Sequence, residues 1–205
     1  MLLAAGNQVI ERACIQLASA HPSRKLIVIN IHYDTGHGIA DDQSAVQLML
    51  ADRVLQVERG IAIQNPLWLA GDGMIIAAGD PDASVFFAYD PTTFFAQGKP
   101  LAITGVMLHM HEFGSSGKVA IIRADGTSTC LLNIPRWDFH WMTSYELQTP
   151  VELQPGDHLY VECRWDNSAA NQKLVNGEFP PPRDLRWGAD EEMCAAIATY
   201  REEVK

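Results

Sequence analysis

The sequence predicts an all-β fold, an antiparallel and jelly-roll-like β-sandwich that follows a short N-terminal helix. Two observations support this prediction. Apolar and polar residues alternate with period two along many short runs, and Gly, Pro and Asp interrupt these runs at regular intervals. A chain of 205 residues is long enough for one well-buried domain with an N-terminal attachment.

The N-terminal segment begins MLLAAGNQVIERACIQLASA. It ends in a signal-like Ala-Ser-Ala, but Gln8, Glu11 and Arg12 interrupt the apolar stretch that a signal peptide needs. We predict a short amphipathic helix instead, which packs on the domain or docks on a protein partner. The domains are then an attachment segment, 1–24, and a sandwich, 25–205. The apolar side of the helix is formed by Val9, Ile10, Ala13 and Leu17.

The clearest strand candidate is Lys25–Tyr33, with the sequence KLIVINIHY. Turns are expected at Ala124–Gly126 and Gln154–Asp157, and the proline-rich stretch Asn176–Asp184 is expected to be an extended loop. Glu191–Tyr200 is ambiguous, since its composition favours a helix while its alternation fits a strand. The remaining strand candidates are Gly60–Gln64, Met74–Ala77, Ser84–Tyr89, Leu101–Met110, Lys118–Arg123, Ser128–Leu132, Tyr145–Leu153 and His158–Trp165.

Composition and charge exclude several classes of function. The net charge of −10 argues against a nucleic-acid partner, because no basic stripe is present to neutralise phosphates. No uninterrupted apolar segment is long enough to predict a membrane span. The four cysteines form no CxxC pair, which excludes a zinc finger.

The segment Leu108-His109-Met110-His111 ends a strong strand candidate. On a strand, residues i and i+2 point to the same side, so the imidazoles of His109 and His111 converge on one point. Such pairs often form copper or zinc sites. From this fragment alone, two histidines on a solvated strand face are an equally good interpretation.

Three longer segments give the pair its context: HMHEFGSSGKVAIIRADG, QPGDHLYVECRWDN and RWGADEEMC. Their order and spacing resemble the second domain of the copper type II, ascorbate-dependent monooxygenases, the group of peptidylglycine α-hydroxylating and dopamine β-monooxygenases. The resemblance implies that one copper ion is bound by His109, His111 and Met193. It also implies that the EMC segment belongs to a strand. Two imidazoles with one soft thioether suit copper better than zinc, and they leave a position open for dioxygen.

The resemblance further implies a disulfide between Cys163 and Cys194. Such a bridge would indicate a periplasmic or extracellular protein, whereas a reducing compartment would leave two buried thiols. Cys14 and Cys130 have no counterpart in the family and are expected to be free.

An upstream stretch, KLIVINIHYDTG, resembles the end of the family's first domain, where a histidine binds the second, electron-transferring copper. The matching residue is His32, a candidate for a second site. Its usual companions are an adjacent His-His pair, and this sequence contains none. We therefore expect His32 not to bind copper, and a catalytic protein would take electrons from an external donor.

The residues at the substrate-binding positions differ from those of the peptide-hydroxylating members of the family. Their carboxylate-binding arginine corresponds to Met107, which cannot form a bidentate ion pair. Their asparagine and tyrosine beyond EMC correspond to Ala195 and Ile197. Glycine-extended peptides are therefore not expected as substrates. The aromatic stretch Trp137–Trp141 is closer to bacterial members, and its His140 is a candidate ligand contact or an ordinary surface histidine.

Two functions stay open at this point. One is a copper-binding, oxygen-activating domain, a monooxygenase without the electron-transfer copper domain. The other is a non-catalytic accessory subunit of a larger periplasmic or membrane-associated complex that keeps the fold.

Overall fold

The computed structural model describes residues 56–203 apart from 72, 175 and 176, and before residue 56 it describes only the backbone of four strands. The chain forms two compact units, Met1–Arg53 and Val54–Lys205. In the first unit, β1 (Leu3–Ala4) pairs with β4 (Ala45–Val46).

The N-terminal helix that the sequence predicts is wrong, because Arg12–His21 forms strand β2. This strand pairs antiparallel with β3 (Arg24–His32), which confirms the strand predicted at Lys25–Tyr33. Backbone pairing with the neighbouring strand outweighs the helical propensity of the Ala, Leu and Gln residues in this segment. The prediction that residues 1–24 bind a protein partner remains, but it no longer involves a helix.

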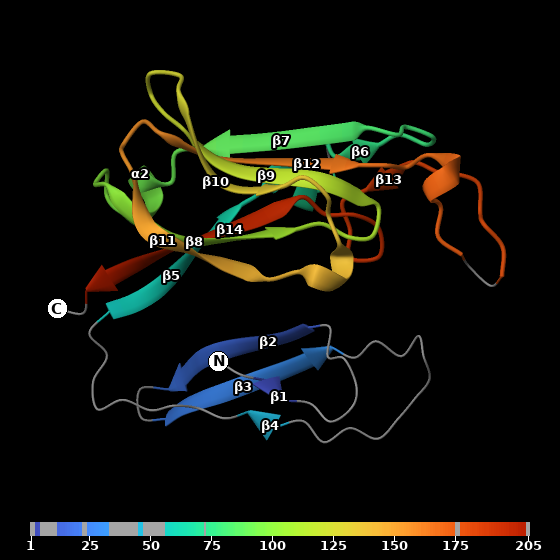
Figure 1. Cartoon of the computed structure of the whole chain (residues 1–205). Helices are drawn as coiled ribbons and strands as arrows, with labels where there is room; N and C mark the ends of the chain where they lie inside the picture. Colours follow the sequence, from blue (N-terminus) through green and yellow to red (C-terminus); the bar gives the residue numbers. More distant parts are fainter. Residues whose placement is uncertain are drawn as a thin grey trace. The chain divides into compact units, whose positions relative to one another are not determined.

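The second unit is a sandwich of two antiparallel sheets, which Figure 1 shows as two layers. One sheet has the order β10-β9-β12-β7 and the other the order β11-β8-β14-β5. The predicted all-β sandwich is therefore confirmed. The first sheet consists of β7 (Ala83–Tyr89), β9 (Gly114–Ile122), β10 (Ser128–Ile134) and β12 (His158–Trp165). The second consists of β5 (Gln56–Ile63), β8 (Leu101–His109), β11 (Ser144–Leu153) and β14 (Ala195–Glu203).

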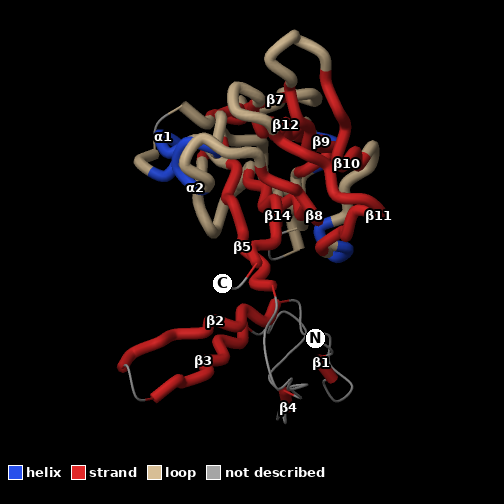
Figure 2. Tube along the Cα trace, turned by 90° about the vertical axis from the view of Figure 1, so that its left-hand side faces the viewer, coloured by secondary structure: helices blue, strands red, loops and turns tan. Residues whose placement is uncertain are grey.

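Short elements complete the unit, and Figure 2 shows them around the two sheets. The sequence did not predict α1 (Pro66–Leu69), α2 (Thr92–Phe95) or the single-turn helices η1 (Phe139–Trp141) and η2 (Ala169–Asn171). A small third sheet pairs β6 (Ile75–Ile76) with β13 (Leu185–Arg186). None of the helices in the described part of the chain is long and apolar enough to cross a membrane.

The core lies between the two layers and follows the alternation of the sequence. In β12, Leu159, Val161, Cys163 and Trp165 are fully buried, and the residues between them face outward. Each such apolar side chain contributes about 1.5–3 kcal/mol by leaving water. The predicted turns are confirmed by hydrogen bonds from the N–H of Gly126 to the carbonyl of Arg123 and from that of Asp157 to Gln154.

The last strand, β14, resolves the ambiguity in Glu191–Tyr200 in favour of a strand, but only from Ala195 onward. The EMC tripeptide, which the resemblance implied to be part of a strand, lies just before it. It is a central strand, paired with β5 on one side and β8 on the other. Its register places Ala195 opposite His109, so the EMC segment enters the sheet beside the histidine pair.

Candidate metal centre

The two histidines of the HxH motif lie where β8 leaves the sheet. His109 is the last residue of β8 and is half-buried, while His111 follows the strand and is only 8% exposed. Their ring centroids are 5.0 Å apart and the ring planes meet at 78°. The two imidazoles are therefore close enough to face one ion.

Hydrogen bonds indicate which nitrogen of each ring carries the lone pair. The Nδ1 of His111 lies 3.1 Å from the carbonyl oxygen of Glu191, which can only accept. The Nδ1 of His109 lies 2.8 Å from the thioether sulfur of Met142, also an acceptor. We therefore assign the proton to Nδ1 in both rings, which leaves the lone pair on Nε2. A ring held in this way is the usual form of a metal-binding histidine.

Met193 lies between Cys194 and Glu192, just before β14, and is half-buried. It lines a cavity of about 290 Å³ that His109 also lines. Two residues of the predicted ligand set, His109 and Met193, thus line the same cavity. Among the described residues, no group of three or more His, Cys, Asp or Glu side chains is placed to hold a metal ion.

Glu192 connects the turn that carries His111 to the segment that carries Met193. The sequence alone did not predict this role. Its fully buried carboxylate accepts hydrogen bonds from the backbone N–H of His111 at 2.9 Å and of Phe113 at 2.8 Å. The indole N–H of Trp165 donates a third at 2.8 Å. Burial raises the pKa of Glu192, and these hydrogen bonds offset part of the rise. The residue beside Met193 thereby fixes the turn that carries His111.

The predicted disulfide is present: Cys163 and Cys194 are bonded, with Cα atoms 5.8 Å apart. It joins β12 of one sheet to the residue that follows Met193, and so connects the two layers at the site. Cys130 is a free, exposed cysteine, as predicted. The side chain of Cys14 lies outside the described residues.

Trp137 supports the same turn through the carbonyl group of His111. Its indole N–H donates to the carbonyl of His111 at 3.0 Å, and its backbone N–H donates to Ser115. Trp137 is 8% exposed. Both the N–H and the C=O of His111 are therefore held by buried side chains, which limits the positions that its ring can adopt.

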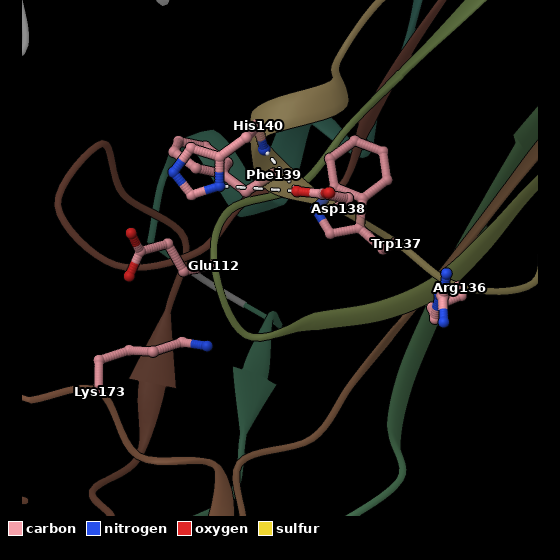
Figure 3. A pocket seen from close by; sticks show the side chains of 7 residues that line it. All are labelled: Glu112, Arg136, Trp137, Asp138, Phe139, His140 and Lys173. Atoms are coloured by element: carbon pink, nitrogen blue, oxygen red, sulfur yellow. Dashed lines mark hydrogen bonds and ion pairs between the residues drawn. The ribbon is translucent and has the colours of Figure 1, made fainter.

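A second cavity, of about 380 Å³, lies beside the histidine turn and is lined by both charged and aromatic side chains. Figure 3 shows Glu112 and Lys173 on one side of it and Asp138 and His140 on the other. His140 is largely exposed, and its ring lies 3.6 Å from the carboxylate of Asp138. The structure thus places His140 in a cavity other than the one that His109 and Met193 line. The candidate second-site residue His32 ends β3, and its side chain lies outside the described residues.

The sequence from residue 83 to 205 matches the family model described as copper type II ascorbate-dependent monooxygenase, C-terminal domain. The matched range begins at β7 and contains the histidine pair, Met193 and both bridged cysteines. The upstream stretch around His32 lies outside it. The chain matches no curated protein. By this match over more than half of its length, the chain belongs to the copper type II ascorbate-dependent monooxygenase family and carries its C-terminal domain.

Proposed function

We propose that His109, His111 and Met193 bind one copper ion and that this centre hydroxylates a C–H bond with dioxygen. One observation carries the proposal. The ring of His109 lies 5.0 Å from the ring of His111 and also lines the cavity that Met193 lines. The proposal is thus supported by the ring contact of His109 with His111 and by the cavity that His109 and Met193 both line.

The donor set fits copper. Two imidazole nitrogens bind both oxidation states of copper, and the soft thioether favours Cu(I). Bound copper would supply the one-electron redox chemistry and the oxygen reactivity. The protein supplies orientation, because the carbonyl of Glu191 holds the tautomer of His111 and the carboxylate of Glu192 holds its backbone.

The reaction needs electrons that the proposed centre alone does not provide. Hydroxylation inserts one atom of dioxygen into the C–H bond and reduces the other to water, which consumes two electrons and two protons. We propose that an external reductant supplies these electrons. The disulfide supports a location outside reducing compartments, in a periplasm or beyond the cell.

Copper binding by the full chain and its histidine variants tests the proposal. We expect one copper per chain. His109→Ala and His111→Ala should each weaken Cu(I) affinity by more than about a hundredfold, beyond the loss typical of outer-shell changes. The matched controls are His140→Ala and His158→Ala, which remove exposed histidines and should leave the affinity unchanged.

The other outcomes are equally clear. Unchanged affinity in the His109 and His111 variants would overturn the ligand assignment. Two tightly bound copper ions would indicate a second site, for which His32 is the candidate. A copper-free protein that copurifies in constant ratio with a larger assembly would overturn the proposal and favour the accessory-subunit function.

A further inference from the structure

The cavity beside His109 and Met193 lies on the outer face of the sheet β11-β8-β14-β5. Ile197 of β14 lies between Met107 of β8 and Ala62 of β5 in the register. The alternate residues Ile61, Ile63 and Leu108 point inward and are buried. The remaining lining residues are Gln64, His109, Met193, Ala195 and Ala196.

The described residues that line this cavity carry no carboxylate, ammonium or guanidinium group. Gln64 and His109 supply its only polar side chains. The neighbouring cavity in Figure 3 differs in this respect, since it is lined by Glu112, Arg136, Asp138 and Lys173. An ionised group in the apolar cavity would lose water without gaining a charged partner, which is unfavourable.

The size of the cavity limits what it can hold. A volume of about 290 Å³ lies at the lower end of the range usual for ligand pockets, about 300–1,000 Å³, so the cavity suits a molecule smaller than a typical drug. Ile197, 41% exposed, lies where the cavity meets solvent.

We propose that this cavity binds a small, uncharged, apolar organic molecule and holds its C–H bond beside the copper ligands. The inference rests on the proposed function, and it names the class of substrate for that centre. Met107 and Ile197 determine the specificity, because they are paired neighbours on β8 and β14 and supply the bulky apolar part of the lining outside the ligand set.

Toluene and benzoate test the inference, because they share size and shape and differ in charge. The full chain is labelled at its seven methionine methyl groups and titrated by NMR in the metal-free state. Toluene should shift the signals of Met107 and Met193 saturably. The signals of Met74, which is 1% exposed and does not line the cavity, should stay in place. Benzoate should shift none of them.

Two variants separate cavity binding from surface adsorption. Ile197→Trp fills the cavity and should weaken toluene binding by at least about tenfold. The control Ile75→Trp enlarges an isoleucine of similar exposure on β6, outside the cavity, and should have no effect. Met107→Arg adds a cation and should make benzoate bind in preference to toluene.

Equal binding of benzoate and toluene to the unmodified chain would overturn the inference, as would toluene binding that Ile197→Trp leaves unchanged. Because the titration is done without metal, it is independent of the ligand assignment. Copper binding without toluene binding would refute the substrate class alone. Toluene binding by a chain that binds no copper would refute the proposed function and leave an apolar binding cavity.

Discussion

The carboxylate of Glu192 accepts a hydrogen bond from the backbone N–H of His111 at 2.9 Å, across a separation of 81 residues. A second bond, from the N–H of Phe113, uses its other oxygen. Since Glu192 directly precedes Met193, this one side chain determines how the segment before β14 meets the histidine turn. The two parts of the proposed ligand set are therefore positioned relative to each other by a buried acid.

Glu192→Gln tests this positioning role. The amide keeps the volume but turns a donor toward N–H groups that need an acceptor. We expect a loss of about 1–3 kcal/mol in the free energy of unfolding and a fall of about 10–100-fold in copper affinity. Denaturant titration and copper competition measure the two effects, with Glu146→Gln on exposed β11 as the control. Unchanged copper affinity in a destabilised variant would limit Glu192 to folding.

The disulfide should stabilise the sandwich chiefly by restricting the unfolded chain. A closed loop with a sequence separation of 31 residues predicts a stabilisation of about 3–4 kcal/mol. The double variant Cys163→Ser, Cys194→Ser should lose this amount in urea unfolding, while Cys130→Ser should lose none. If the double variant is as stable as the unmodified chain, the bridge does not stabilise the fold.

The pH dependence of stability has a predicted sign at Asp157. Burial alone raises the pKa of this carboxyl, but hydrogen bonds from Gln154, Arg123 and Ala124 lower it below its usual value. Because the folded pKa lies below the unfolded one, near about 3.9, the stabilisation is present above that pH. It is lost as the pH falls through the folded pKa. Arg123 forms the ion pair at 2.8 Å.

Urea unfolding at a series of pH values checks this prediction. The unmodified chain should lose stability on the acid side faster than Asp157→Asn, whose uncharged amide does not titrate. The turn that Asp157 closes is remote in sequence from the proposed ligands, so the copper stoichiometry of the variant should match that of the unmodified chain at neutral pH. Parallel acid profiles for the two proteins would contradict the assignment.

The period-two alternation predicted the described strands of the sandwich well, and it is clearest in β12, where every second residue is buried. It was insufficient at Arg12–His21, where alanine, leucine and glutamine favour a helix locally and only pairing with β3 produces a strand. The same conflict at Glu191–Tyr200 is settled by the two neighbours of β14. Pairing of this kind is a long-range effect, and local composition does not contain it.

Only those residues of the candidate site that belong to a recognisable sequence motif could be predicted. The histidine pair has a spacing that a strand explains, and the family resemblance supplied Met193 and the disulfide. Glu192 and Met142 were missed, because their contacts with His111 and His109 span 81 and 33 residues. The EMC tripeptide offered one usable signal for Glu192, an acid that directly precedes the expected ligand Met193 and the expected disulfide cysteine Cys194.

Two thioethers lie near His109, so the identity of the sulfur ligand is the part of the proposed ligand set that most needs a direct test. Met193 shares a cavity with His109, and the sulfur of Met142 lies 2.8 Å from its Nδ1. Because the Nδ1 of His109 contacts the sulfur of Met142, we assign its Nε2 to copper, which makes Met142 an outer contact and Met193 the proposed ligand. X-ray absorption of the Cu(I)-loaded chain detects the copper–sulfur distance directly.

We predict a copper–sulfur signal in the unmodified chain, with one sulfur per copper, that disappears in Met193→Leu and persists in Met142→Leu. Leucine keeps the volume of either methionine without its sulfur, so the two variants are matched. A signal that persists in Met193→Leu, or one that disappears in Met142→Leu instead, would contradict the central claim that His109, His111 and Met193 bind the copper.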